Sequence, residues 1–123
     1  MARGLETFLT AFAFGVTCTS PAMADPLLRE FATCTGRFSA LVEHQWLVDG
    51  PASEISARQR DHLWALVETV AGPQEATLAL HWRIEAKVAH KALLERAWFA
   101  ADKVAENRSA QLLQGCAALI GQS

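Results

Sequence analysis

The sequence has no tyrosine, only four prolines, no long apolar run in its main body and almost no net charge. Its 11 Lys and Arg residues stand against 13 Asp and Glu residues, a formal net charge of −2. This balance argues against a nucleic-acid partner, because such proteins need a basic surface to displace counterions. No stretch beyond residue 24 approaches the roughly 18 uncharged apolar residues of a membrane-spanning helix. At 51% hydrophobic and 20% charged residues, the chain is expected to fold as one small domain.

Several catalytic and cofactor signatures are also missing. The sequence contains no Gly-x-Ser-x-Gly elbow, no glycine-rich phosphate loop and no His-Glu-x-x-His. It contains no Cys-x-x-Cys-His, which excludes covalent attachment of a c-type haem. We therefore expect a protein that is not an enzyme and that holds no cofactor.

Residues 1–24 have the features of a secretory signal peptide. Arg3 supplies positive charge, residues 8–18 are uncharged and mostly apolar, and Ala-Met-Ala at residues 22–24 fits a signal peptidase site. Cleavage before Asp25 would leave residues 25–123 as a single helical domain in the periplasm, without a transmembrane segment and without methionine for His/Met haem ligation. The alternatives are a buried N-terminal helix and a lipoprotein modified at Cys18.

Removal of the signal peptide leaves two cysteines, Cys34 and Cys116. An even pair in a small exported chain is expected to form a disulfide. In the chain-entropy model, such a long loop contributes ~4.5 kcal/mol of stability. The alternative is two independent buried thiols.

Four helical segments separated by turn signals predict an all-α fold, an up-down-up-down four-helix bundle with one disulfide between helices 1 and 4. Asp25-Pro26 starts the first helix, and residues 49–51 (Asp-Gly-Pro) end it, with Gly50 able to adopt a left-handed cap. Ser53 or Ser56 is expected to cap the second, which Gly-Pro at residues 72–73 ends. The third spans about residues 74–101, and Asp102 caps the fourth.

Three of these helices have one apolar face each. The faces consist of Leu27, Phe31, Cys34, Phe38, Leu41, Val42 and Trp46 in the first helix, Ile55, Gln59, Leu63, Leu66, Val67 and Val70 in the second, and Val104, Arg108, Leu112, Cys116, Leu119 and Ile120 in the fourth. Gly36 and Gly115 lie near the cysteines, which suggests either close backbone approach at the disulfide or local helix breaks.

The third helix has two apolar sides. Leu80, Ile84, Val88, Leu94, Trp98 and Phe99 form one, and Leu78, Trp82, Ala86, Ala89, Leu93 and Ala97 form the other. A surface helix needs only one, so this helix is either central or contacts a partner.

Basic and aromatic residues of the third helix are the candidate partner-binding residues, since Trp and Arg dominate interface energetics. They are Trp82, Arg83, Lys87, Lys91, Trp98 and Phe99. The expected partner is another periplasmic or membrane-complex protein, or a second copy of the chain. Arg83, Lys87 and Lys91 recur at four-residue spacing, and the simpler interpretation of this basic row is a solvated ridge of the helix.

Three histidines, His44, His62 and His81, lie close to tryptophans in the sequence, and His81 shares a helical face with Glu85. Neutral imidazole ligates haem and metals, so a bis-His haem or a divalent metal is the alternative function. Partly exposed histidines at the bundle surface are the simpler interpretation.

Three segments carry a resemblance: residues 34–40 (CTGRFSA), 43–46 (EHQW) and 81–86 (HWRIEA). They resemble segments of small exported proteins of Gram-negative bacteria to which no activity is assigned. The resemblance implies periplasmic export and no site residues. The architecture also invites comparison with small helical periplasmic chaperones, so a stress chaperone is a third candidate function.

Overall fold

The computed structural model describes residue 15 and residues 24–121. The predicted signal peptide therefore lies almost wholly outside the described residues. The side chain of Asp25, the predicted cap of the first helix, also lies outside them.

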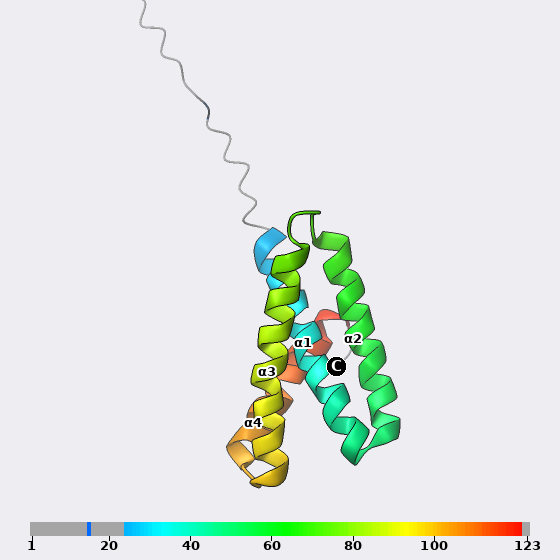
Figure 1. Ribbon diagram of the computed structural model, residues 1–123, viewed down its shortest axis with the longest axis vertical. Helices are drawn as coiled ribbons and strands as arrows, with labels where there is room; N and C mark the ends of the chain where they lie inside the picture. The colour runs from blue at the N-terminus through cyan, green and yellow to red at the C-terminus, as the bar shows by residue number, and fades with distance from the viewer. Residues whose placement is uncertain (1–14, 16–23, 122–123) are drawn as a thin grey trace, which may run out of the picture.

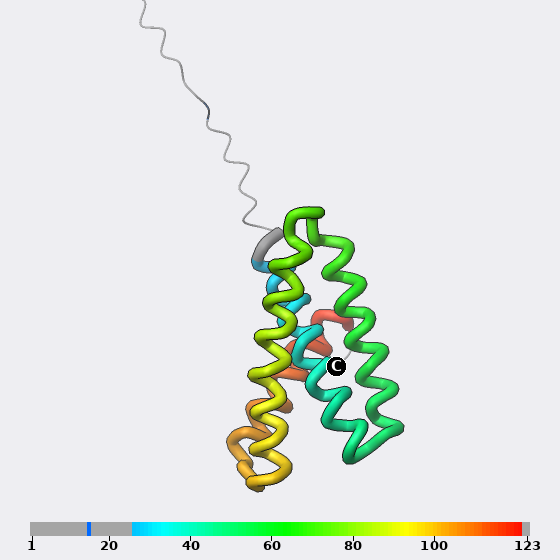
Figure 2. Tube along the Cα trace, in the orientation of Figure 1, coloured from blue at the N-terminus to red at the C-terminus, as the bar shows by residue number. Residues whose placement is uncertain are grey.

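Four helices make up the fold, and the described residues contain no strand: α1 (Ala24–Val48), α2 (Gly50–Val70), α3 (Ala76–Phe99) and α4 (Lys103–Leu119). Figure 1 shows successive helices running in opposite directions, and the trace in Figure 2 shows α1 and α3 descending together while α2 and α4 return. The predicted up-down-up-down bundle is confirmed. None of the described helices has the length and apolarity that crossing a bilayer requires.

The enclosed helix is α1, which packs mainly against α2 and α3 and also contacts α4. Between Phe31 and Val42 it buries side chains on nearly all sides; Cys34 and Ala40, for example, are 2% and 1% exposed. The backbone of α2 scarcely approaches α3 or α4. The sequence left open whether the third helix is central; the structure gives that position to α1 and leaves one side of α3 uncovered.

Gly36 allows the parallel helices α1 and α3 to pack closely. A Cβ atom at this position would overlap the carbonyl oxygen of Arg83 and lie 2.9 Å from the backbone nitrogen of Lys87. Only glycine permits such close backbone approach. The expectation that Gly36 serves the disulfide is therefore wrong: it serves the contact with α3. A Cβ atom at Gly115 would have no neighbour within 4 Å, so no close approach explains this glycine, and neither glycine breaks its helix.

A continuous apolar core surrounds the middle of α1, and the predicted disulfide lies within it. The Cα atoms of Cys34 and Cys116 are 5.4 Å apart, so the bridge joins α1 to α4. The buried members of the core are Leu28, Phe31, Ala32, Cys34, Phe38, Leu63, Val67, Ala79 and Cys116.

The turn between α1 and α2 differs from the prediction. α2 starts at Gly50, and its cap is Asp49, whose Oδ1 accepts a hydrogen bond from the Ala52 nitrogen at 3.3 Å. Ser53 and Ser56, the predicted caps, instead lie inside α2 and are buried. Pro is well suited to the first turn of a helix. Pro51 therefore lies in the first turn of α2, although the same residue type also signals the end of a preceding helix. Gly50 accordingly has no left-handed conformation.

The other two turns follow the sequence more closely. α2 ends just before Gly72 and Pro73, as expected. Asp102 caps α4, accepting hydrogen bonds from Val104 and Ala105 nitrogens at 3.0 and 3.1 Å. α3 stops at Phe99, two residues earlier than predicted, because Ala101 adopts a left-handed conformation with φ of 50°.

The predicted apolar faces are not buried at their ends. Leu27, Trp46, Ile55 and Val104 were expected to be buried, but their exposed fractions are 42%, 64%, 56% and 79%. Part of the reason is unequal helix length: α1 has 25 residues and α4 has 17. At 1.5 Å per residue, α4 leaves about 12 Å of α1 uncovered. The periodicity continues past the point where a neighbouring helix exists to cover it.

Candidate functional site

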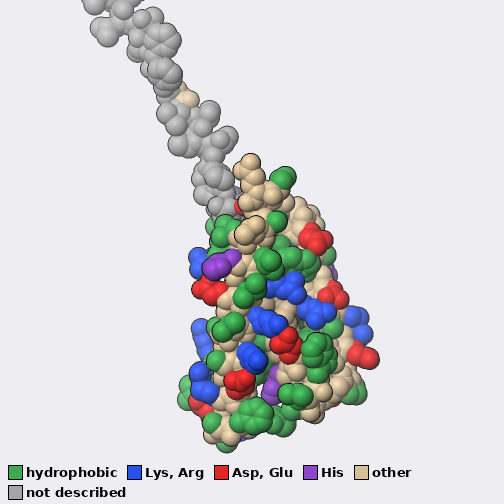
Figure 3. Space-filling view, in the orientation of Figure 1, with side chains coloured by type: hydrophobic (Ala, Val, Ile, Leu, Met, Phe, Trp, Pro, Cys, Tyr) green, Lys and Arg blue, Asp and Glu red, His purple; other side chains and the backbone are tan. Residues whose placement is uncertain are grey.

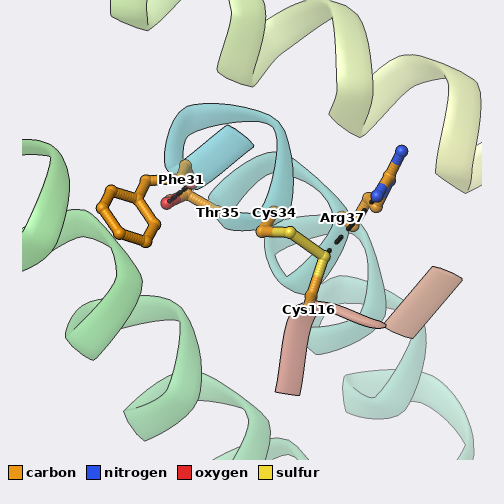
Figure 4. Close-up of a disulfide and its surroundings, with 5 residues drawn as sticks. All are labelled: Phe31, Cys34, Thr35, Arg37 and Cys116. Atoms are coloured by element: carbon orange, nitrogen blue, oxygen red, sulfur yellow. Dashed lines mark hydrogen bonds between the residues drawn. A yellow bond between two sulfur atoms is a disulfide. The ribbon is translucent and has the colours of Figure 1, made fainter. Parts of the chain in front are cut away.

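The disulfide lies in the apolar core and also accepts a hydrogen bond from a charged side chain. In Figure 4 the Arg37 side chain extends from α1 past Cys116, and its Nη1 donates a hydrogen bond to the Cys116 sulfur at 3.6 Å. Thr35 Oγ1 donates to the Phe31 carbonyl oxygen at 2.8 Å, which keeps this buried hydroxyl satisfied within α1. Burial and the nearby charge of Arg108 lower the pKa of Arg37.

The uncovered side of α3 carries several exposed apolar side chains. We call it the outer face of α3 and define it by five large side chains that are 46–74% exposed: Leu80, Ile84, Val88, Trp98 and Phe99. In the view of Figure 3, hydrophobic side chains lie over α3 along its length, with basic and acidic side chains between them. Leu94, predicted to share this side, is instead buried against α1 and α4.

Two hollows adjoin the C-terminal end of the outer face, beside Trp98 and Phe99. One of about 220 Å³ lies between the two helices and is lined by Trp46, Leu47, Lys91 and Phe99, among others. A second, of about 680 Å³, opens between α1, α3 and α4 and includes Trp98. The outer face therefore ends in concave apolar surface, into which a side chain of another molecule can insert.

Arg83 and Trp82, two of the candidate partner-binding residues, stack against side chains of neighbouring helices. The Arg83 guanidinium lies 4.7 Å from the centre of the Trp64 ring, and its Nη2 donates to Ser39 Oγ at 3.3 Å, so it joins α3 to α2 and α1. Burial lowers the Arg83 pKa. Trp82 is half-buried and has the Arg29 guanidinium 5.6 Å from its ring centre.

The other four partner-binding candidates lie nearer the solvent. Lys87 forms an ion pair with Glu43 of α1. Lys91 is exposed and has no ion-pair partner among residues 24–121. Trp98 and Phe99 are 58% and 74% exposed. The structure thus brings Lys91, Trp98 and Phe99 to one surface region and separates Arg83 from them.

The three histidines of the haem or metal alternative do not come together. His44 packs edge-on against Trp98, with ring centres 5.5 Å apart, and lines both hollows. His62 is exposed on α2, and His81 is exposed on α3 with its Nε2 3.5 Å from Glu85 Oε2. The described part of the chain contains no group of three or more His, Cys, Asp or Glu side chains placed to hold a metal.

His90, for which the sequence pattern indicated no role, is the buried histidine of the bundle. It is 1% exposed, and its Nε2 lies 2.9 Å from Ser109 Oγ of α4. Burial, with the charge of Arg37, lowers its pKa to about 4, so its ring is neutral at pH 7. The one signal in the sequence was its position, four residues before Leu94 and four after Ala86 on the inward side of α3.

The chain matches no protein-family model, and no curated protein or solved structure shows significant similarity to it.

Proposed function

We propose that this chain is an exported, non-catalytic protein-binding module, whose outer face of α3 docks an amphipathic helix of another protein. The observation that carries the proposal is the set of five exposed apolar side chains on one side of α3. Exposed large apolar side chains gathered on one side of a helix in a small protein are typical of an interaction site.

The dimensions of the outer face suit a helix. Leu80 and Trp98 are 18 positions apart in continuous helix, which is about 27 Å at 1.5 Å per residue. An amphipathic helix presents anchors every three or four residues over such a length. The small hollow beside Phe99 would accept one of its larger side chains.

Charge narrows the chemistry of the partner. Lys91 and Glu95 lie one helical turn apart between Val88 and Trp98, are exposed and have no ion-pair partner within the described part of the chain. A partner helix with one acidic and one basic residue at the edge of its apolar face would complement them, and charge complementarity of this kind sets orientation and partner choice.

Export to the periplasm is part of the proposal. The Cys34–Cys116 pair supports it, because protein disulfides persist in oxidising compartments. The expected product isolated from the native cell begins at Asp25 and has no free thiol. Intact-protein mass spectrometry with and without reduction measures both properties. A product that still begins at Met1, or that has two free thiols, contradicts this part of the proposal.

Site-specific photo-crosslinking in living cells tests the docking surface. A photoreactive residue is placed at Ile84 in one variant and at Ile55 of α2 in another; these isoleucines are 53% and 56% exposed, which makes them a matched pair. We expect Ile84 to crosslink to a helix of one protein, at the apolar side of that helix, and Ile55 to crosslink far less.

The same experiment distinguishes other molecules that could cover the outer face. Crosslinks between two copies of this chain would indicate self-association and not a different partner protein. Crosslinks to many unrelated proteins would indicate a chaperone role and not docking of one partner. Equal crosslinking from both positions would contradict any docking role for the outer face.

A further inference from the structure

A groove rich in arginine runs between α1 and α3, away from the outer face. It consists of two adjoining hollows of about 210 and 550 Å³. Arg29, Thr33, Arg37 and Trp82 line both of them. We call this feature the arginine groove. The three α1 residues recur at four-residue spacing, which places their side chains on one side of the helix.

The two arginines of the arginine groove are not engaged by a carboxylate of the described residues. Within the described part of the chain, neither Arg29 nor Arg37 has an ion pair with a carboxylate. Arg29 lies over the Trp82 ring, and Arg37 contacts the disulfide sulfur. Burial and the nearby charge of Arg108 lower the pKa of Arg37, and Glu30 opposes this shift only in part.

A buried donor or acceptor without a partner lies at the floor of the arginine groove. His90 lines the smaller hollow, is 1% exposed, and has no hydrogen-bond partner for Nδ1 among the described residues. Its other nitrogen, Nε2, is occupied by the Ser109 hydroxyl. When Ser109 donates to Nε2, the neutral ring carries its proton on Nδ1 and can donate it. Unpartnered buried polar atoms are costly and call for a ligand or water.

We propose that the arginine groove binds a small molecule through an oxyanion group, a carboxylate or a phosphate, held by Arg29, Thr33 and Arg37 beside Trp82. Guanidinium groups bind such oxyanions with charge-assisted hydrogen bonds. The half-buried Trp82 ring offers a flat apolar surface to the rest of the molecule.

The acidic residues of the groove limit the ligand. Glu85 lines the smaller hollow and lies 3.5 Å from His81, and Glu30 lines the larger hollow. These carboxylates repel a second anionic group on the ligand, so the groove favours a compact molecule with one oxyanion over a polyanion. This site is independent of the outer face of α3, and either can exist without the other.

Calorimetric titration of the oxidised protein tests the proposal with three probes: inorganic phosphate, benzoate and the uncharged analogue benzamide. Arg29→Gln is the main variant, because Arg29 is exposed and its loss leaves the core intact. Arg58→Gln is the matched control, since Arg58 is exposed on α2. The imidazole nitrogens of His90 are followed by nitrogen-15 NMR in the same titrations.

We expect saturable binding of phosphate or benzoate, no binding of benzamide, and a shift of the His90 Nδ1 resonance on saturation. Loss of one charge-assisted contact in Arg29→Gln should weaken binding about tenfold, whereas Arg58→Gln should leave it unchanged. Preference for phosphate or for benzoate identifies the head group. The proposal is overturned by absence of saturable binding up to ~10 mM, equal weakening in both variants, or an unmoved His90 resonance.

Discussion

α1 and α3 are of nearly equal length, with 25 and 24 residues, but the sequence of α1 shows one apolar face and that of α3 shows two. Their surroundings are opposite. α1 is enclosed by the other three helices, whereas α3 buries one side and exposes five large apolar side chains on the other. The comparison shows that an apolar composition does not identify the central helix of a bundle.

The small side chains of α1, more than the apolar composition of either helix, explain why α1 is enclosed and α3 is not. α1 presents Ala32, Gly36 and Ala40 at four-residue spacing, and all three are buried. The backbone of α3 approaches at Gly36 more closely than a Cβ atom would allow. A helix that other helices can approach this closely is readily surrounded. α3 has large side chains on its outer side, and no helix among the described residues covers them.

The largest expected effect concerns the disulfide, which ties the enclosed helix α1 to α4. Replacing both Cys34 and Cys116 by Ser should lower the free energy of unfolding by about 4 kcal/mol, because the open chain regains loop entropy when unfolded. Urea denaturation of the oxidised protein and the double variant measures the change. A difference below ~1 kcal/mol would show that the bond adds little to the enclosure of α1.

The second effect concerns the buried side of α3 and depends on pH. An unfolded histidine takes up a proton near pH 6.5, whereas the pKa of His90 in the folded protein is about 4. The contribution of His90 to stability is therefore complete above pH 6.5 and is lost as the pH falls toward 4, by at most about 3 kcal/mol.

Carboxylates also titrate in this pH range, so the measurement compares variants. Denaturation at pH 7 and pH 4.5 should show a smaller loss of stability in His90→Asn than in the wild type. His62→Asn, at an exposed position on α2, should behave as the wild type does. Equal pH dependence in all three proteins would mean that His90 is not the buried titrating group of α3.

The third effect tests where α1 and α3 meet. Gly36→Ala should lower the free energy of unfolding by about 1–3 kcal/mol, because the added methyl group forces the two backbones apart. Gly115→Ala is the control, with open space at its Cβ position; there Ala should raise stability by up to about 1 kcal/mol. Thermal unfolding of both variants gives the two signs. Stabilisation by Gly36→Ala would contradict the close packing of α1 and α3.

The smallest effect concerns the outer face. Ile84→Gln with Val88→Gln should change the free energy of unfolding by less than about 0.5 kcal/mol, since both side chains already contact water. Leu94→Ala, on the buried side, should cost about 2 kcal/mol. Urea denaturation compares the two. A large loss in the Gln double variant would make the outer face part of the core.

Local signals in the sequence predicted much of the fold. Asp102 was recognised as a cap because its side chain acts on the next two or three backbone groups, and the Cys34–Cys116 pairing was predicted by export and even cysteine count. The position of Asp49 as a cap was missed because Gly and Pro both end one helix and start another.

The candidate sites depended on tertiary placement, which no local pattern encodes. Arg83 and Lys91 look equivalent in the sequence, because both belong to a row of basic residues at four-residue spacing. In the structure Arg83 of α3 contacts side chains of α2 and α1, whereas Lys91 faces solvent. Arg29 and Arg37 become candidate ligand-binding residues only because Trp82 and His90 of α3 line the same hollow.

Protection of α3 in the native cell tests the central claim most directly. Hydroxyl-radical footprinting reports solvent access to Ile84, Trp98 and Ile55 in the purified protein and in intact cells. We predict that all three are modified in the purified protein, and that Ile84 and Trp98 become protected in cells while Ile55 does not. Equal modification of all three positions under both conditions would show that the outer face of α3 stays open to water and docks nothing.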